Sequence, residues 1–229
     1  MQPTYLPWMG YFEMVAEVDI FVLLDNVQFE KKSWQNRNRI KAKSGELILT
    51  VPTDTSKKFE QQIKDVKITK DSGFAKKHLK SISLNYSRSK FFEKYFPSIC
   101  ELISNNNMSL SDLNHDLIVY IASQLGITTE IIRASHLDAS GKSTKLTVAQ
   151  CIELGASEFY AAKGSRQYVS AERDFKKHGI QVIFQDYSHP IYPQLHGEFI
   201  PNLSAIDLLF NCGEKSLEMI LAKPIRERT

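Results

Sequence analysis

The chain has 229 residues, a hydrophobic fraction of 42%, a charged fraction of 24% and a formal net charge of +3. This length and composition are ordinary for a globular protein, and they allow one α/β-sized domain with a substantial core. No window approaches the roughly 18 uninterrupted apolar residues of a transmembrane helix, and the N-terminus lacks the basic flank and apolar core of a signal peptide.

The N-terminal half is expected to begin with a helix followed by strands. Residues 10–18 show an amphipathic helical pattern, and the apolar run 20–24 is typical of a strand buried on both faces. Residues 47–51 form the next expected strand, which ends at Pro52. Apolar and polar residues alternate loosely over 53–70, which indicates one more strand. Helices are then expected over 72–105 and 113–125.

The C-terminal half alternates strands and helices more regularly. Strands are expected at 129–134, 158–162 and 180–185, and helices at 147–154, 167–178 and 203–210. This alternation indicates βαβ units. The expected fold class is therefore α/β: a mostly parallel sheet with flanking helices, and a basic α+β insertion after the first βα segment. We expect one domain over residues 1–229, with the insertion at about 30–105.

The segment from Gln28 to Lys41 combines cations, amides and aromatic rings. It contains five Lys or Arg residues and one acid, with Trp34 among them. Arg and Asn side chains present fixed donor geometries that suit phosphate or carboxylate. The segment follows a predicted strand, so it is expected to form an anion-binding surface there. Its candidate ligand-binding residues are Gln28, Trp34, Asn36, Arg37, Asn38, Arg39 and Lys41.

Charge is distributed unevenly along the chain. Residues 31–94 carry 17 Lys and Arg against 6 Asp and Glu, a net +11, whereas the remaining residues carry 12 against 20, a net −8. Such a basic block can bind nucleic acid, an acidic lipid surface or a phosphorylated small molecule. A lysine-rich solvated face is the alternative interpretation.

Three further loops are placed where a parallel sheet usually meets its ligand. The first is the stiff N-terminal loop that precedes the first helix, with Gln2, Tyr5 and Trp8; a purely structural entry to the helix is its alternative. The second follows the strand 158–162 and offers Gly164 for close backbone approach, with Arg166 and Tyr168 beside it. A simple strand–turn–helix connection is equally consistent with that pattern.

The third loop contains His189, Tyr192 and Gln194. His189 is a candidate general acid or base, although a histidine in a tight loop is often only a hydrogen-bonded structural residue. His189 and His196 do not have a known zinc-ligand spacing, and neither do the three widely separated cysteines. The sequence therefore predicts no metal site, and its cysteine usage is typical of a reducing cytoplasm.

Together these segments resemble the WbqC-like proteins. The resemblance covers nearly the whole chain and rests on the following motifs: Gln2-Pro3-x-Tyr5-Leu6-Pro7-Trp8-x-Gly10-Tyr11-Phe12, Asp19-x-Phe21-Val22-x-Leu24-Asp25-x-Val27-Gln28-Phe29, Asn36-Arg37-Asn38-Arg39-Ile40-Lys41, His189-Pro190-x-Tyr192-Pro193-Gln194 and Leu203-Ser204-x-x-Asp207. It implies a link to bacterial surface-polysaccharide synthesis, and to transfer of a glycyl or other acyl group to an amino sugar. It implies no catalytic residue and no cofactor.

The leading hypothesis is a cytoplasmic transferase that acts on a nucleotide-linked amino sugar. Arg37, Arg39 and Lys41 would bind phosphate, while Tyr5, Trp8 and Trp34 would stack on a base or sugar. His189 would deprotonate the attacking amine, and Asp25 would orient a hydroxyl or amine. The alternatives are a non-catalytic nucleic-acid-binding protein and an ATP-dependent ligase or nucleotidyltransferase. The oligomeric state does not follow from the sequence.

Overall fold

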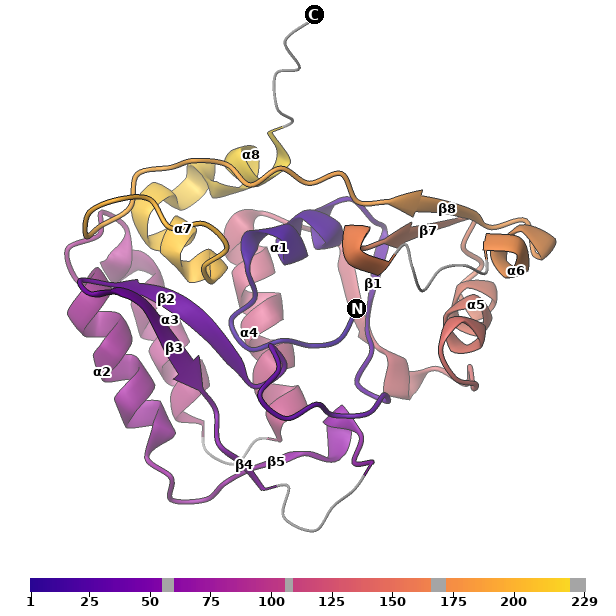
Figure 1. Cartoon of the computed structure of the whole chain (residues 1–229), viewed down its shortest axis with the longest axis horizontal. Helices are drawn as coiled ribbons and strands as arrows, with labels where there is room; N and C mark the ends of the chain where they lie inside the picture. Colours follow the sequence, from indigo (N-terminus) through magenta and orange to yellow (C-terminus); the bar gives the residue numbers. More distant parts are fainter. Residues whose placement is uncertain (55–59, 106–108, 166–171, 223–229) are drawn as a thin grey trace, which may run out of the picture.

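The computed structural model describes residues 1–54, 60–105, 109–165 and 172–222 (Figure 1). Its α-helices are α1 (Met9–Ala16), α2 (Phe74–Tyr86), α3 (Phe92–Ser104), α4 (Leu110–Leu125), α5 (Thr144–Glu153), α6 (Glu172–Lys177), α7 (Ala205–Cys212) and α8 (Ser216–Leu221). Short 3-10 turns follow several elements: η1 (Ile63–Asp65), η2 (Ala134–His136), η3 (Lys163–Ser165) and η4 (Gly213–Lys215).

The strands are β1 (Ile20–Leu23), β2 (Arg37–Ala42), β3 (Gly45–Thr50), β4 (Thr53–Asp54), β5 (Lys67–Ile68), β6 (Glu130–Arg133), β7 (Glu158–Ala161) and β8 (Gln181–Phe184). They form two-stranded sheets: β1–β6 and β7–β8 are parallel, and β2–β3 and β4–β5 are antiparallel. The mixed helix and strand content matches the expected fold class. A continuous, mostly parallel sheet is not formed by the described residues, since each parallel pair stands as a separate ladder.

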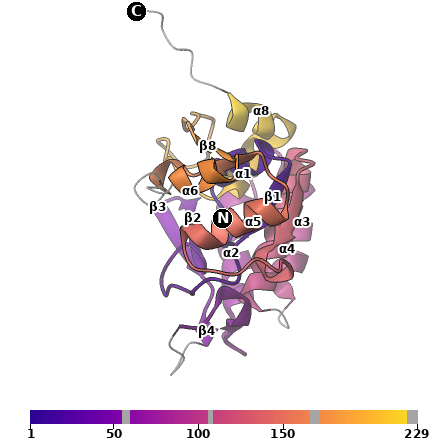
Figure 2. The ribbon, with the colours of Figure 1, turned by 90° about the vertical axis from the view of Figure 1, so that its right-hand side faces the viewer.

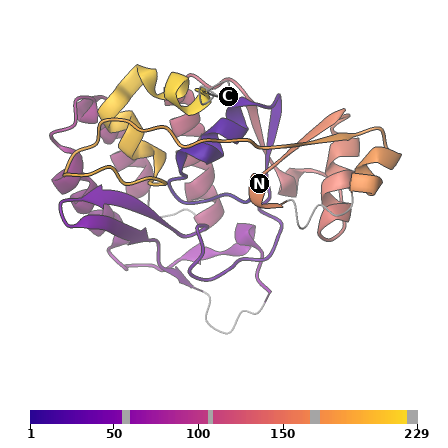
Figure 3. The same cartoon turned by 45° about the horizontal axis from the view of Figure 1, so that its top comes forward.

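The elements are spread along the long axis of the molecule. Figure 1 shows α2, α3 and the β2–β3 hairpin at one end, and β7, β8, α5 and α6 at the other, with α1 and α4 between them. In Figure 2 the second end faces the viewer, and α5 and α6 form its outer layer. The chain from β8 to α7 runs along one side of the molecule and reaches the β2–β3 hairpin (Figure 3). This path brings the third predicted loop to the hairpin.

The hairpin is where the basic Asn-Arg-Asn-Arg run is located. The sequence placed this run on a surface after a strand, but Arg37–Ala42 is itself a strand, paired with β3 in the register Arg37↔Thr50 and Arg39↔Ile48. Side chains alternate between the two faces of a strand. Ile40 is therefore in the core on one face, whereas Arg37 and Arg39 lie on the other with Ile48, which is 52% exposed.

One large apolar cluster holds most elements together. It joins residues of α1, α2, α3, α4 and α7 with β2, β3 and the N-terminal loop. A small second cluster of Val148, Cys151, Phe175 and Ile180 holds α5, α6 and the start of β8. Among the described helices, none combines the length and apolar content that a bilayer crossing needs.

Candidate functional site

Three segments that are distant in sequence meet around the N-terminal loop. The backbone N–H of Tyr5 donates to the carbonyl of Trp34 at 3.1 Å, and the N–H of Ala205 donates to the carbonyl of Pro7 at 2.7 Å. The N–H of Ser204 donates to the carbonyl of Arg39 at 2.9 Å, so the segment before α7 is also joined to β2. Residues 2–8 are thus held between the strand β2 and the start of α7.

Asn38 fixes the backbone of that loop. Its Nδ2 donates to the carbonyls of Tyr5 at 3.1 Å and Leu6 at 2.7 Å, and its Oδ1 accepts from the N–H of Arg39. Leu6 has a positive φ of 44°, an uncommon conformation for a residue with a side chain. Because a strained backbone persists only where its surroundings hold it, Asn38 is the residue that stabilises this turn.

A second amide anchors the other side of the loop. Asn114 of α4 is fully buried, and its Nδ2 donates to the carbonyls of Pro3 at 3.3 Å and Gln35 at 2.8 Å. The Nε2 of Gln35 also donates to the Oε1 of Gln2 at 3.0 Å. Gln2 is therefore half-buried inside this junction and serves to hold the two loops in register.

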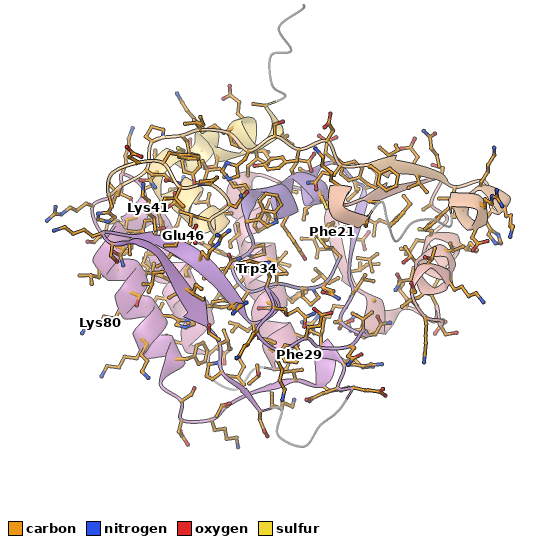
Figure 4. The ribbon with its side chains drawn as sticks, viewed as in Figure 1. Phe21, Phe29, Trp34, Lys41, Glu46 and Lys80 are labelled. Atoms are coloured by element: carbon orange, nitrogen blue, oxygen red, sulfur yellow. The ribbon has the colours of Figure 1, made fainter. Side chains whose placement is uncertain are left out.

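Trp34 forms the exposed centre of the assembled surface. Its side chain is 48% exposed, and Figure 4 shows it between the hairpin and α1. The guanidinium carbons of Arg37 and Arg39 lie 5.8 Å and 5.3 Å from its ring centroid. Cations at this range over an indole are attracted by its π face. The surface thus combines the exposed indole ring of Trp34 with the guanidinium groups of Arg37 and Arg39.

The two arginines differ in their partners. The Nη1 of Arg39 donates to both carboxylate oxygens of Glu46 at 3.0 Å, and its Nη2 donates to the carbonyl of Asn202 at 3.2 Å. The side chain of Arg37, in contrast, makes no hydrogen bond or ion pair to any residue that the structure describes. The buried Nε of both arginines lacks an acceptor there. Arg37 is consequently the cation with donors to spare for an anionic ligand.

An aromatic group continues this surface toward α1. Trp8 contacts Tyr187 edge-on at 5.4 Å between ring centroids, and Tyr187 lies 6.2 Å from His189. Asn202 links this group to the hairpin, because its carbonyl accepts from Arg39 and its N–H donates to the Nε2 of His189 at 3.0 Å. The N-terminal, hairpin and third loops therefore meet at one region.

The resulting family assignment agrees with the motifs. The sequence model of the WbqC-like protein family matches residues 2–219. The chain belongs to the WbqC-like protein family. It is similar to an uncharacterised protein of Mycobacterium tuberculosis, Rv1507c, with 34% identity over 218 residues that cover 94% of each chain. No solved structure matches the chain significantly.

In this WbqC-like protein, His189 does not have the geometry of a general base. Its Nδ1 donates to the carbonyl of Pro190 at 2.9 Å, while its Nε2 accepts from Asn202, so both ring nitrogens are occupied. These partners fix the neutral tautomer with the proton on Nδ1. Burial lowers the pKa of His189, which also favours the neutral ring. In this structure His189 therefore joins Pro190 to Asn202, and neither ring nitrogen is open to accept a proton.

Asp25 is likewise structural. Its side chain is 1% exposed, its Oδ1 accepts from the N–H of Ser135 at 2.9 Å, and its Oδ2 accepts from the Ser135 hydroxyl at 2.7 Å. The carboxylate thus joins the end of β1 to the η2 turn after β6. A carboxylate enclosed in this way cannot orient a substrate group.

Several other predicted ligand-binding residues lie in the interior. Tyr5 has no exposed surface and shares a 2.9 Å hydrogen bond with the Nδ1 of His78, so its ring cannot stack on a ligand. Asn36 is 5% exposed and donates to the carbonyl of Val51. Asn36 and Asn38 are therefore buried beneath the site, where they hold backbone carbonyls and do not contact a ligand.

Lys41 belongs to a buried polar network below the site. Its Nζ donates to the Oε1 of Gln194 and to the carbonyls of Gly197 and Glu198. Tyr86 and Tyr192 both donate to the fully buried carboxylate of Asp207, at 2.7 Å and 2.8 Å, and Gln194 donates to the Tyr192 hydroxyl. The roles predicted for Lys41, Tyr192 and Gln194 at the ligand are corrected accordingly.

Burial governs the ionisation of this network. Burial lowers the pKa of Lys41, an effect that the nearby Asp207 carboxylate opposes. Burial raises the pKa of Asp207, while the two tyrosine hydroxyls and Lys41 act in the other direction. The network joins β2, α2 and α7, so it fixes the hairpin on the helices.

Within the described residues, no hydrogen bond or ring contact joins Gln28 or Gly164 to Trp34. Gln28 is exposed and forms an isolated antiparallel bridge with Gln62. Gly164 is exposed in η3, and a Cβ there would meet nothing within 4 Å. Arg166 and Tyr168 fall within 166–171, outside the described residues.

Sequence reasoning missed an acidic cavity beside Tyr187. It has a volume of about 240 Å³, and its lining includes Glu13, Glu17, Tyr160, Asp186 and Tyr187. Glu13 is 8% exposed and accepts from the Tyr160 hydroxyl at 2.9 Å and from the Nε2 of Gln185 at 2.6 Å. The only signal in the sequence was an acid on the apolar face of α1. Within the described chain, no three His, Cys, Asp or Glu side chains gather to hold a metal ion.

Proposed function

We propose that this protein binds a nucleotide-linked amino sugar and takes part in transferring an acyl or aminoacyl group to it during bacterial surface-polysaccharide synthesis. The observation that carries the proposal is the exposed Trp34 ring flanked by two guanidiniums, one of which, Arg37, has no acceptor among the described residues. A base or sugar would stack on Trp34, and a phosphate would accept from Arg37.

The acidic cavity supports the amino-sugar part of the proposal. Carboxylates of Glu13, Glu17 and Asp186 line it together with two tyrosines. An ammonium group is attracted to such a lining, whereas a phosphate is repelled. Tyr187 lines the cavity and also contacts Trp8. Tyr187 is also next to His189, which Asn202 links to Arg39, so this aromatic group lies between the acidic cavity and the arginines.

The transferase part rests on the family resemblance, which links WbqC-like proteins to polysaccharide synthesis. Acylation of an amine needs a group that removes a proton from nitrogen. His189 cannot do so while its Nε2 accepts from Asn202. We therefore assign no residue of the chain as the catalytic base.

Calorimetric titration with a panel of nucleoside-diphosphate sugars, with and without a sugar amine, tests the binding step. Replacing Arg37 by Ala is expected to weaken binding by about 1–3 kcal/mol, because a charged hydrogen bond is lost. Replacing Trp34 by Ala should cost a similar amount, about 1–3 kcal/mol, through lost stacking. Absence of binding by the folded wild-type protein would rule out the proposal.

Lys43→Ala is the matched control, since Lys43 is an exposed cation at the far end of the same hairpin. It should leave the affinity unchanged. If single-stranded oligonucleotides bind with a steep salt dependence and nucleotide sugars do not, the Trp34 surface serves nucleic acid instead.

A further inference from the structure

The outer face of α2 carries the densest unopposed positive charge among the described helices. From Ser72 to Phe92 the sequence has no acid, and it contains the five cations Lys76, Lys77, Lys80, Arg88 and Lys90. All five are exposed. Asp71 and Glu93 are the first acids on either side in the sequence. The Trp34 site does not account for this charge, because Lys80 points outward at the far side of α2, away from Trp34 (Figure 4).

Helical geometry collects the three cations of α2 on one stripe. At about 100° per residue, Lys76, Lys80, Leu84 and Lys77 fall within an arc of roughly 100°. The opposite arc holds the buried residues Phe74, His78, Ile82, Asn85 and Tyr86. Figure 4 shows Lys80 on the outer side of the helix, pointing away from the body of the protein. The side chains of Lys76, Lys77 and Lys80 make no hydrogen bond or ion pair to the described part of the chain, although the helix backbone is hydrogen-bonded, as by the Lys77 N–H to the Gly73 carbonyl.

A leucine lies beside the lysines, at the C-terminal end of the stripe. Leu84 is 75% exposed, and it lies one turn after Lys80 and two turns after Lys77. A solvated lysine face does not need a large exposed apolar side chain beside its lysines. Phosphates of a nucleic acid would neutralise the lysines but would leave Leu84 in water. An anionic lipid surface accommodates both, because headgroups bind the cations while the acyl boundary receives the leucine.

We propose that the outer face of α2 docks the protein on an anionic lipid surface, with Lys76, Lys77 and Lys80 on the headgroups and Leu84 inserted between them. The interaction is peripheral and reversible, since one leucine and a few lysines give modest affinity. Electrostatic attraction of this kind weakens as salt rises.

Co-sedimentation of the full chain with vesicles tests the proposal. Binding is expected to phosphatidylglycerol–phosphatidylcholine vesicles and not to phosphatidylcholine alone. The double variant Lys77→Glu/Lys80→Glu should lower the partition coefficient by about 30-fold or more, since each lost cation contributes roughly 1 kcal/mol. Leu84→Ser should lower it by several-fold at unchanged charge, which separates apolar insertion from electrostatics.

Two matched controls keep the test specific. Lys176→Glu/Lys177→Glu makes the same change in net charge on α6, and Ile152→Ser removes a side chain that is 50% exposed on α5. Both should leave vesicle binding intact. The proposal is overturned if the α6 variant loses as much binding as the α2 variant, if Leu84→Ser has no effect, or if the protein binds RNA or DNA oligonucleotides but not anionic vesicles.

Discussion

At the scale of single residues, polar side chains near the site divide into those that face solvent and those that hold the backbone. Arg37 and Trp34 retain exposed surface and open interaction capacity within the described chain. Asp25, Asn38 and His189 use their polar atoms on backbone groups. Buried polar groups are costly unless they are hydrogen-bonded, so the second group is needed for folding whatever the ligand.

Asp25 gives a direct test of this division. Asp25→Ala leaves the N–H and hydroxyl of Ser135 without their acceptor, and we expect a loss of about 1.5–3 kcal/mol in the free energy of unfolding. Urea denaturation measures it, and Asp138→Ala, at an exposed position, should have little effect. If Asp25→Ala abolished ligand binding at full stability, Asp25 would belong to the ligand site after all.

At the scale of elements, the entry to α1 depends on close contact between Gly10 and Trp8. A Cβ on Gly10 would come within 2.3 Å of the Trp8 ring, so Gly10→Ala must displace that ring from Tyr187. We expect a loss of about 1–3 kcal/mol of stability, as for overpacked cores.

The displacement can be measured by fluorescence in a Trp34→Phe background, where Trp8 is the remaining tryptophan of the two in the chain. Its emission should shift with Gly10→Ala. Gly164→Ala serves as the control, because no atom lies near its added Cβ. An unchanged emission and unfolding midpoint for Gly10→Ala would contradict the contact.

Much of the element pattern could be predicted from the sequence. The apolar runs gave β1, β6, β7 and β8 within a residue or two, because short runs of Ile, Val and Phe favour strands. The strand β2 was missed because Arg37, Asn38 and Arg39 do not show the apolar, β-branched composition that is typical of a strand. The segment is a strand because it pairs with β3, and Asn38 then uses its side chain to hold the carbonyls of Tyr5 and Leu6.

The candidate site was predictable as a meeting of loops but not in its assignment of roles. Trp34 and Arg37 were selected by residue type and spacing, and their contact with a ligand stays a prediction. The burial of Lys41 and the engagement of His189 depend on residues 194–202, whose distance in sequence hides the contact. Residue type alone does not distinguish a lysine that binds phosphate from one that is surrounded by carbonyl groups.

At the scale of the whole molecule, stability should depend on pH through His78. Burial lowers the pKa of His78 from 6.5 to about 4. Between these values the unfolded chain binds a proton that the folded protein does not, so stability falls as the pH is lowered from 6.5 to about 4. The loss amounts to about 3 kcal/mol at this site.

Urea denaturation across this pH range checks the prediction by comparing the wild type with His78→Gln. The variant should lose less stability on acidification, although it starts lower because Tyr5 loses its partner. His136→Gln, at an exposed position, should follow the wild type. Parallel curves for wild type and His78→Gln would show that His78 is protonated equally in both states.

The strand β2 has a consequence for how function is transferred between relatives. Asn38 supports the N-terminal loop, Arg39 donates a hydrogen bond to the carbonyl of Asn202, and Lys41 is enclosed by residues 194–198. Selection for folding alone would therefore preserve most of the Asn-Arg-Asn-Arg motif, even in a family member that had lost its ligand. Shared motifs in this strand identify common ancestry, and a shared substrate should be inferred only where the positions of Trp34 and Arg37 also agree.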